Sequence, residues 1–590
     1  MNRITTWMMV LLMCIGGTIS AQTADEMARE KVVNEILDDM SLTEKIGQLY
    51  IVSFSSRQTP ERLAQIEEYI RDYELGGLIL MYSDLQAAAD LMNDWIERPK
   101  VPFLMTIDAE WGLSMRFDDV VKFPQQMQLG SLSSPELVYE MGLQVGEQLR
   151  RFGFQVNYAP VVDVNNNPNN PVINVRSFGE DPERVTDYAA AYVRGMQDAG
   201  MAVSLKHFPG HGDTSVDSHH DLPLLNFDRA RLDSIELYPF RELIRRENIE
   251  MVMLGHLNVP ALDSTGTPSS LSKPMVTGLL KEEMGYDGIV ITDALGMKGV
   301  SNHLAPEEIP LAAFEAGVDI MLMPSDVPGS IRQLKKAVRR GRISREDLDE
   351  RVRKVLRLKY DLGLLPLDQP RMKVTKASLL QELNKREYKD LVRRIGEETL
   401  ILFEKGQQQK TAAAFPLQNK KVAYVGFHPA DQAEQAFLGE ALSAYTEVDS
   451  FLLPATATLE EFQALKDRLE TEYQTVVIGL HHTHRNPQRA FGMNDWQVGA
   501  LDAWMAETER PQLVVAFFGI PYGYTLFHNT GMLDAFVIAH MNTDYNNAAV
   551  ARLLAGEIEA QGVLPVTLSG VEVVEAETVP EGDAFIDNLE

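Results

Sequence analysis

Short apolar runs alternate with longer amphipathic segments along the first two thirds of the chain. Each run has five to eight residues and is rich in Val, Ile, Leu and Met, as expected for a buried strand. Strands that alternate with helical segments predict a parallel sheet wrapped by helices. Eight such runs lie at residues 48–54, 76–81, 102–107, 154–161, 201–206, 250–255, 288–292 and 317–323. Eight strand–helix units that close on themselves form a TIM-type (β/α)8 barrel.

A second set of apolar runs predicts a smaller, open α/β sandwich domain after the barrel. These runs lie at residues 399–404, 421–426, 448–453, 475–480, 512–519 and 534–540. The Pro-interrupted stretch 362–374 separates the two sets, so we expect a barrel domain at 22–365, a linker region at 366–394 and the second domain at 395–590. Two polar stretches, NNNPNN at 165–170 and GQQQKTAAA at 406–414, are interpreted as surface loops.

Composition and charge narrow the class of partner. Hydrophobic residues make up 45% and charged residues 24% of the 590 residues, which is typical of folded globular domains. The formal net charge is −30. Nucleic acids and anionic membrane surfaces would repel such a chain, so a neutral or locally recognised substrate is favoured. The oligomeric state is left open.

The N-terminus has the pattern of a secretory signal peptide. A single basic residue precedes an apolar run from Trp7 to Ile15, and small residues follow up to position 21. We therefore expect residues 1–21 to be removed and the protein to be exported, either periplasmic or secreted. The only cysteine, Cys14, lies in this segment, so the mature chain is predicted to have no disulfide and no cysteine metal site.

Polar residues follow several of the predicted strands, where a barrel places its functional groups. Asp293 is the strongest single candidate for a functional residue, because it directly follows the apolar run GIVIT and so points a partly desolvated carboxylate at the barrel mouth. Such a group can attack an electrophilic carbon. The alternative is that Asp293 caps the helix that follows.

The loop KHFPGHGDTSVDSHHDLP, residues 206–223, holds four histidines. Zinc sites on barrels collect imidazoles from different strands, whereas these share one loop, so a metal site is not favoured. Asp217 lies two residues before His219. A carboxylate at that spacing can fix the imidazole tautomer, which makes His219 a candidate general acid–base; a solvated polar loop is the alternative.

Four segments resemble signature segments of glycoside hydrolase family 3. They are KHFPGHGDTSVDSHHDLP, GIVITDALGM, RSFGEDP and IDAEWGLSMRF, and the first resembles the β-N-acetylglucosaminidase branch most specifically. The resemblance covers residues 42–365 and extends loosely over the second domain, whose ending GVLPVTLS is similar to that of two-domain members.

The resemblance implies a role for each matching residue. Asp293 corresponds to the nucleophile of a retaining mechanism with a covalent glycosyl-enzyme intermediate, His219 to the acid–base, and Asp217 to the partner that orients it. No metal or cofactor is implied. The residues implied to hold the hydroxyls and the N-acetyl group of the terminal sugar are Asp108, Arg116, Arg176, Lys206 and His207.

The sequence thus predicts a retaining exo-acting β-N-acetylhexosaminidase that removes terminal N-acetylglucosamine from peptidoglycan fragments or other glycans. A β-glucosidase is the first alternative, although its acid is usually a glutamate of the second domain. A glycoside phosphorylase of the same family and a non-catalytic carbohydrate-binding protein are two others. Trp111 and Ala294 depart from the family pattern, so the sugar preference is left open. In the second domain, the segment HHTHRNP at 481–487 either lines the leaving-group side of the site or is a surface loop.

Overall fold

The computed structural model describes residues 24–214, 221–302, 304–409, 417, 421–429 and 437–568. Its first part is an eight-stranded parallel sheet with the strand order β7-β6-β5-β4-β3-β2-β1-β8. The strands are β1 (Tyr50–Phe54), β2 (Gly77–Leu80), β3 (Leu104–Ile107), β4 (Val156–Asn157), β5 (Ala202–Phe208), β6 (Met251–Leu254), β7 (Ile289–Thr292) and β8 (Met321–Leu322). All eight predicted strands are present, and β4 and β8 are shorter than predicted.

The two ends of this strand order meet, so the sheet closes. β8 pairs with β1 in the register Tyr50↔Met321. On its other side a parallel bridge joins Ile291 of β7 to Ile320, and the Thr292 N–H donates to the Ile320 carbonyl at 3.1 Å. The predicted TIM-type barrel is confirmed.

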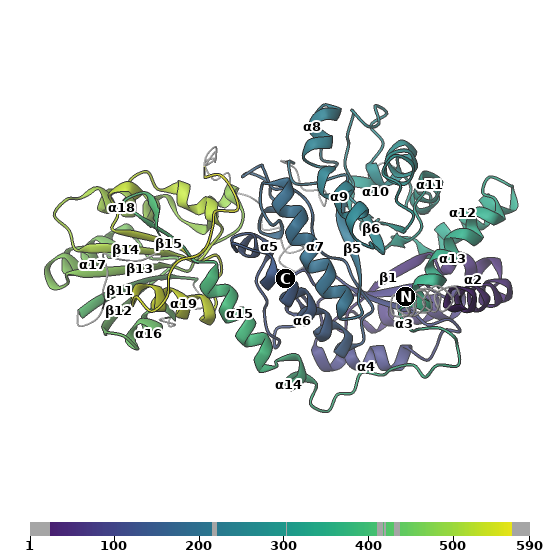
Figure 1. Cartoon of the computed structure of the whole chain (residues 1–590), viewed down its shortest axis with the longest axis horizontal. Coiled ribbons are helices and arrows are strands. Elements are labelled where there is room, and N and C mark those ends of the chain that lie inside the picture. Colours follow the sequence, from purple (N-terminus) through teal and green to yellow (C-terminus); the bar gives the residue numbers. More distant parts are fainter. Residues whose placement is uncertain are drawn as a thin grey trace, which may run out of the picture.

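Helices follow the strands and cover the outside of the barrel (Figure 1). Local sequence fixes where they begin: at the start of α7 the Asp181 carboxylate accepts from the Arg184 N–H, and Pro182 occupies the first turn. They are α2 (Leu42–Gly47), α3 (Pro60–Tyr73), α4 (Leu85–Trp95), α5 (Gln126–Leu129), α6 (Glu136–Phe152), α7 (Pro182–Asp198), α8 (Arg229–Ser234), α9 (Tyr238–Arg246), the π-helix η4 (Pro274–Glu283), α10 (Lys298–Ser301), α11 (Ile309–Ala316), α12 (Val327–Arg339) and α13 (Arg345–Asp361).

The second domain is a seven-stranded sheet in the order β10-β9-β15-β14-β13-β11-β12, with β9 and β10 antiparallel to their neighbours. The predicted open α/β domain is confirmed, but the prediction of a loop at Gln407–Gln409 is wrong, since these residues form an edge strand. The strands are β9 (Ile401–Glu404), β10 (Gln407–Gln409), β11 (Lys421–His428), β12 (Glu447–Pro454), β13 (Thr475–Leu480), β14 (Gln512–Phe517) and β15 (Ala535–Ile538). The helices are α16 (Phe437–Ser443), α17 (Leu459–Glu472), α18 (Asp495–Ala506) and α19 (Asp544–Leu554).

The stretch expected to be a linker, 366–394, is largely structured. It contains α14 (Leu379–Leu383) and most of α15 (Arg386–Glu398), which run along α6 and lead to the second domain (Figure 1). Leu379, Leu383 and Leu391 are buried in the barrel's own hydrophobic core. The apolar face of these helices therefore belongs to the barrel, although the Pro-interrupted sequence before them is irregular.

The two domains also meet through direct packing. Met127 of α5 and Val175 of the barrel are buried in the same apolar cluster as the second-domain residue Tyr522. The chain then returns to the barrel after α19, where the carbonyl of Pro565 accepts from the Glu180 N–H at 3.0 Å. This returning segment fixes the second domain beside the loops that follow β4.

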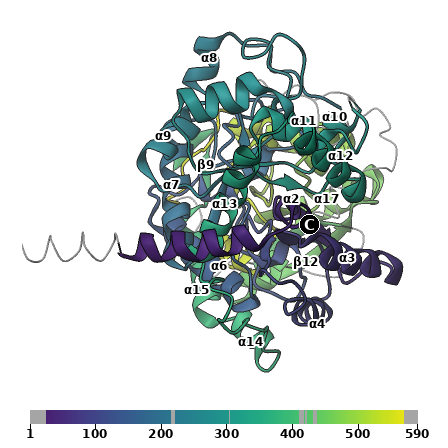
Figure 2. The ribbon, with the colours of Figure 1, turned by 90° about the vertical axis from the view of Figure 1, so that its right-hand side faces the viewer.

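A helix over residues 24–39 lies against the barrel at its N-terminal end, and Figure 2 shows it extending from the molecule. Glu30 pairs with Arg357 of α13 at 2.8 Å. The predicted signal peptide, 1–21, lies outside the described residues. Within the described ranges no helix has the length and apolar character needed to cross a bilayer.

Candidate active site

Charged side chains gather at the carboxyl ends of β3 and β5, where the sequence predicted them. Asp108 directly follows β3, and Lys206 lies near the end of β5. The Lys206 Nζ lies 2.8 Å from an Asp108 oxygen and 2.8 Å from a Glu110 oxygen. Burial disfavours the charged ammonium, but these two carboxylates outweigh it and hold the pKa of Lys206 above its usual value. A buried cation thus ties two acids together.

Arg176 completes the pairing of Glu110. It comes from the short helix η2 (Asn174–Arg176) in the loop after β4, and its guanidinium binds Glu110 through both oxygens, with Nη2 at 2.8 Å and Nε at 3.0 Å. Burial of Glu110 favours its neutral form, yet the charges of Arg176 and Lys206 prevail and hold the pKa of Glu110 well below its usual range. Glu110 is therefore a buried carboxylate that keeps two cations in place.

Arg116 holds the second oxygen of Asp108. Its Nη2 lies 3.3 Å from that oxygen, and its side chain is fully buried. Burial lowers the pKa of Arg116, partly offset by the charge of Asp108. Asp108 is thus clamped by one cation on each oxygen and still has 21% of its side chain exposed, which leaves a carboxylate edge open to a hydroxyl-bearing ligand.

His207 is oriented by a carboxylate. Its Nδ1 lies 2.7 Å from Asp163 Oδ2, and its Nε2 lies 3.3 Å from Arg176 Nη2. A guanidinium only donates, so Nε2 accepts and the Nδ1 proton points to Asp163. Burial alone would raise the pKa of Asp163, but His207 and His211 stabilise its charge and lower it. The imidazole is locked between an acid and a cation.

Asp293 directly follows β7, two strands away from β5 in the barrel order. It is half-buried; its N–H donates to the Leu254 carbonyl of β6 at 2.8 Å, and its Oδ1 accepts from the Ala294 N–H at 2.7 Å. The helix that follows, α10, begins after Met297, so Asp293 does not cap it. The Nε2 of the buried His256, which follows β6, lies 3.2 Å from the Ala294 carbonyl and supports this turn.

Asp217 and His219 lie outside the described residues, so their placement relative to Asp293 stays a prediction. The stretch that leads to them, His211–Thr214, is described. The backbone N–H of His211 donates to Asp163 at 2.7 Å, and the Thr214 hydroxyl lies 2.8 Å from His211 Nδ1. The loop therefore leaves the same cluster that holds His207.

The second-domain segment HHTHRNP contacts the barrel beside this cluster. His481 itself is buried in the second domain, where its Nε2 lies 2.7 Å from the Tyr424 hydroxyl. Further along, the Arg485 carbonyl accepts from Asn174 Nδ2 at 2.7 Å, two residues before Arg176. The segment is thus a domain contact rather than a free surface loop.

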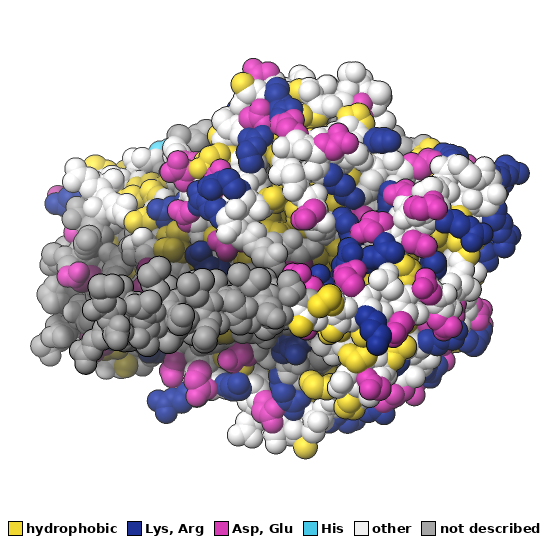
Figure 3. All heavy atoms as spheres, turned by 45° about the vertical axis from the view of Figure 1, so that its right-hand side comes forward, with side chains coloured by type: hydrophobic (Ala, Val, Ile, Leu, Met, Phe, Trp, Pro, Cys, Tyr) yellow, Lys and Arg dark blue, Asp and Glu magenta, His cyan; other side chains and the backbone are white. Residues whose placement is uncertain are grey.

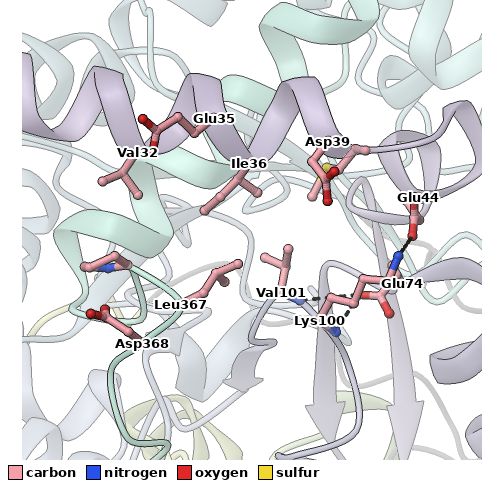
Figure 4. A pocket seen from close by; sticks show the side chains of 12 residues that line it. Val32, Glu35, Ile36, Asp39, Glu44, Glu74, Lys100, Val101, Leu367 and Asp368 are labelled. Atoms are coloured by element: carbon pink, nitrogen blue, oxygen red, sulfur yellow. Dashed lines mark hydrogen bonds and ion pairs between the residues drawn. The ribbon is translucent and has the colours of Figure 1, made fainter.

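A separate cavity of about 450 Å³ lies at the opposite end of the barrel (Figure 4). Val32 and Ile36 of the N-terminal helix, Glu74 before β2, Lys100 before β3 and Leu367 line it. Glu74 is already satisfied by the backbone N–H groups of residues 100 and 101. In barrels this end carries stability rather than catalysis, so we place no chemistry there.

Among the described residues no group of three or more His, Cys, Asp or Glu side chains is arranged to hold a metal ion. Asp108 and Glu110 are instead paired with Lys and Arg, which are not metal ligands, and Asp163 is paired with His207. The expected lack of a metal and of a cofactor stays a prediction.

The family model for the "Glycosyl hydrolase family 3 N terminal domain" matches residues 41–358, more than half of the chain. The chain belongs to glycosyl hydrolase family 3. It is a glycosidase of that family, and the matched range covers all eight barrel strands and every predicted site residue.

Similar proteins support the same branch of family 3. Beta-hexosaminidase A of Pseudoalteromonas piscicida is 29% identical over 565 residues, 86% of this chain and 91% of that protein. Beta-hexosaminidase LpqI of Mycobacterium tuberculosis (strain ATCC 25618 / H37Rv) is 33% identical over 54% of this chain and 83% of its own. The predicted resemblance to the β-N-acetylglucosaminidase branch is confirmed by these similarities.

Solved structures agree with both domains. The family 3 β-N-acetylglucosaminidase from Paenibacillus sp. str. FPU-7 has a TM-score of 0.75 and 32% identity, and the match covers 90% of this chain and 100% of that one. The β-glucoside phosphorylase BglX also has a TM-score of 0.75 but only 20% identity, over 92% of this chain and 96% of its own, so it shares the fold.

Sequence reasoning missed two members of the cluster. Neither Asp163 nor Glu110, both buried, is among the predicted site residues. The signal that could have found Asp163 is its position in the loop after β4, because the loops that follow the strands form the barrel mouth where Asp108 and Lys206 lie. Its partner His207 lies far away in sequence, so the pairing itself needed the structure.

Proposed function

We propose that this family 3 glycosidase is an exo-acting β-N-acetylhexosaminidase that removes terminal β-linked N-acetylglucosamine from peptidoglycan fragments or other glycans. The observation that carries the proposal is the clamped carboxylate Asp108, which stands with Arg176 and His207 at the barrel mouth. His207 on β5 lies two strands from Asp293 in the barrel order, and Asp108 after β3 lies four strands from it. The names of the two hexosaminidase relatives and of the Paenibacillus structure support the choice of sugar.

The spacing suits one sugar ring. Neighbouring strands lie roughly 4.8 Å apart, so β5 with His207 lies within roughly 10 Å of β7, and β3 with Asp108 lies across the barrel mouth from Asp293. A pyranose held by hydrogen bonds to Asp108 and the cations of the cluster would then present its anomeric carbon to Asp293. Because this charged cluster would pair with the hydroxyls of a terminal sugar, we expect cleavage from the chain end.

In the proposed mechanism an oxygen of Asp293 forms a bond to the anomeric carbon while the bond to the leaving oxygen breaks. His219, oriented by Asp217, donates its proton to that oxygen. Water then attacks the anomeric carbon of the glycosyl-aspartate, His219 takes a proton from it, and the carboxylate is released. The two displacements retain the β configuration.

A panel of chromogenic β-glycosides tests the proposal with the wild type and the variants Asp293→Ala and His219→Ala. We expect clear preference for the N-acetylglucosaminide and a loss of several orders of magnitude for Asp293→Ala. For His219→Ala we expect a severe loss with poor leaving groups and a milder one with activated aryl glycosides, since the latter need little protonation.

Three outcomes would count against it. Preference for the glucoside would support the β-glucosidase alternative, and no turnover of any glycoside would support a carbohydrate-binding protein. Wild-type rates for Asp293→Ala would remove Asp293 from the mechanism. EDTA should leave the activity unchanged, because no step uses a metal.

We further propose that the protein is exported, on the signal-peptide pattern of residues 1–21. N-terminal sequencing of protein recovered from the cell envelope and medium should find a chain that begins near residue 22. An N-terminus at Met1 would contradict export by this route.

A further inference from the structure

Asn170 lies at the end of the polar stretch NNNPNN, which the sequence predicted to be a surface loop. The structure instead buries it completely. Its side chain has hydrogen-bond partners on two separate segments of the barrel mouth. One contains the residues before Arg176, and the other is the stretch from which the loop with Asp217 and His219 departs.

The amide nitrogen of Asn170 holds residues 211–214, which form the root of that loop. Its Nδ2 donates to the carbonyls of His211 and Gly212, both at 2.9 Å, and lies 3.4 Å from the Thr214 hydroxyl. These are the last described residues before position 215. The direction in which the chain leaves the cluster is therefore set by contacts to Asn170.

The amide oxygen of Asn170 holds the turn that carries Arg176. It accepts from the N–H groups of Val172 and Ile173, both at 2.8 Å. Asn174, next in the turn, lies 3.4 Å from the Asn170 carbonyl and donates to the Arg485 carbonyl of the second domain. Asn170 thus joins the Arg176 turn, the loop root and, through Asn174, the second domain.

The bonding requires an amide. One end of the side chain must accept two N–H groups, and the other must donate to two carbonyls. Aspartate has the same shape but only accepts, so in the variant Asn170→Asp a carboxylate oxygen would face the carbonyls of His211 and Gly212 without a proton between them. An unpaired buried carbonyl is costly, and the loop root would move to relieve it.

Other contacts leave the root little freedom once Asn170 is in place. A Cβ on Gly212 would overlap the Val164 carbonyl, so the backbone there packs directly on the β4 loop. On the far side Asp213 pairs with Arg231 of α8 at 3.1 Å. The root is held from two sides, and Asn170 supplies the hydrogen bonds from the side of Arg176.

We propose that Asn170 is a positioning residue that sets the departure of the acid–base loop relative to the Arg176 turn. The inference rests on the proposed function, because it acts through His219. Asn170 touches no substrate in this proposal. Replacing Asn170 should therefore impair proton transfer by His219 in part and should not impair sugar binding.

The test compares Asn170→Asp with Asn169→Asp, which adds the same charge to the neighbouring, half-buried residue. Each is assayed on aryl N-acetylglucosaminides with good and poor leaving groups. For Asn170→Asp we expect kcat/KM to fall about 100-fold with the poor leaving group and about 10-fold or less with the good one, the pattern of impaired protonation. Asn169→Asp should stay within about 3-fold of the wild type on both.

A double variant separates positioning from general damage. When Asn170→Asp is added to the His219→Ala variant, we expect it to reduce activity by less than about 3-fold further, because both changes act through the same proton transfer. Full additivity, or equal losses of Asn170→Asp on both leaving groups, would overturn the inference. Wild-type inactivity on the whole panel would instead overturn the proposed function.

Melting curves must show that the variants fold. If Asn170→Asp is unfolded, Asn170→Ser, which keeps a small donor and acceptor, replaces it in the same assays, with a smaller but still leaving-group-dependent loss expected. Hydrogen exchange of the folded variant should rise at residues 211–214 and not at β3. Unchanged exchange at 211–214 would also overturn the inference.

Discussion

At the scale of single residues, the site is organised by buried charges that satisfy one another. Glu110 is nearly inaccessible, yet it stays ionised because Arg176 and Lys206 bind it. Buried ion pairs of this kind contribute little net stability but are costly to break, since the remaining charges lose their partner. The same arrangement fixes the two cations that face the predicted sugar.

Replacing Glu110 by Gln should therefore destabilise the barrel. We expect the free energy of unfolding to fall by about 3 kcal/mol near neutral pH, as for other broken buried pairs. Because the folded-state pKa of Glu110 is lowered, its contribution is present above its unfolded value near 4.5 and is lost as the pH falls below it. Denaturant unfolding at pH 7 and pH 4 measures both effects.

The exposed Glu68 on α3 gives the matched control, and Glu68→Gln should change the free energy by less than about 0.5 kcal/mol. A Glu110→Gln enzyme as stable as the wild type would show that the two cations find other partners.

The proposed role of His219 as a neutral acid–base leads to a second prediction at this scale. The imidazole of His219, unlike the glutamate of a β-glucosidase, does not repel an anion during the second displacement. We expect inorganic phosphate to compete with water and to yield a sugar 1-phosphate, detectable by chromatography. His219→Glu, which restores a negative charge, should suppress that product while water remains an acceptor. Absence of the sugar phosphate with the wild type would refute this.

At the scale of elements, the sequence determined the strands better than their connections. The apolar runs GIVIT and TVVIGL predicted β7 and β13 because buried parallel strands are continuously apolar. The edge strand β10 is three glutamines, and its position comes from pairing with β9, which no local pattern encodes. Asn170 and Asp163 were hidden for the same reason, since their partners are distant in sequence.

The segment that returns from the second domain to the barrel offers an element-scale test. Gly179 has φ +140°, and a Cβ there would overlap the Pro565 carbonyl. We expect Gly179→Ala to lower the melting temperature by several degrees, because both the backbone and the domain contact are strained. Calorimetry gives the measurement.

Gly266→Ala is the control for that test, since Gly266 also has a positive φ, +76°, but no atom lies within 4 Å of the added Cβ. Its smaller loss reports the backbone cost alone. Equal shifts for the two variants would mean that the Pro565 contact does not hold the domains together.

At the scale of the whole molecule, we expect a fall in pH to destabilise the second domain first. The rings of His428 and His481 stack inside it with centroids 4.7 Å apart. The Nε2 of the buried His540 lies 3.1 Å from the Thr399 carbonyl. Burial lowers the pKa of His428 to about 4, of His481 to about 3, with a contribution from His428, and of His540 to about 4. All three are therefore neutral in the folded protein near pH 7.

Since the unfolded histidines titrate near 6.5, the unfolded state binds these protons first and acid favours unfolding. The free energy of unfolding should fall between about pH 6.5 and pH 4 by about 1.4 kcal/mol per pH unit for each histidine. His428→Phe should flatten this slope, whereas the exposed His528→Phe should not. An identical slope in both variants would contradict the explanation.

Acidic and basic side chains are interspersed on the face shown in Figure 3. The described chain also has exposed ion pairs on the barrel and on the linking helix α15, such as Arg342 with Glu315 and Arg394 with Glu140. Exposed pairs of this kind contribute little to stability.

The helix over residues 24–39 begins at the end of the barrel that lies away from the catalytic loops. An enzyme immobilised on a bead through a tag placed before residue 24 would accordingly turn its open mouth outward. Long glycan strands would reach it without crossing the support, and catalytic output per bound molecule should match that of the free enzyme.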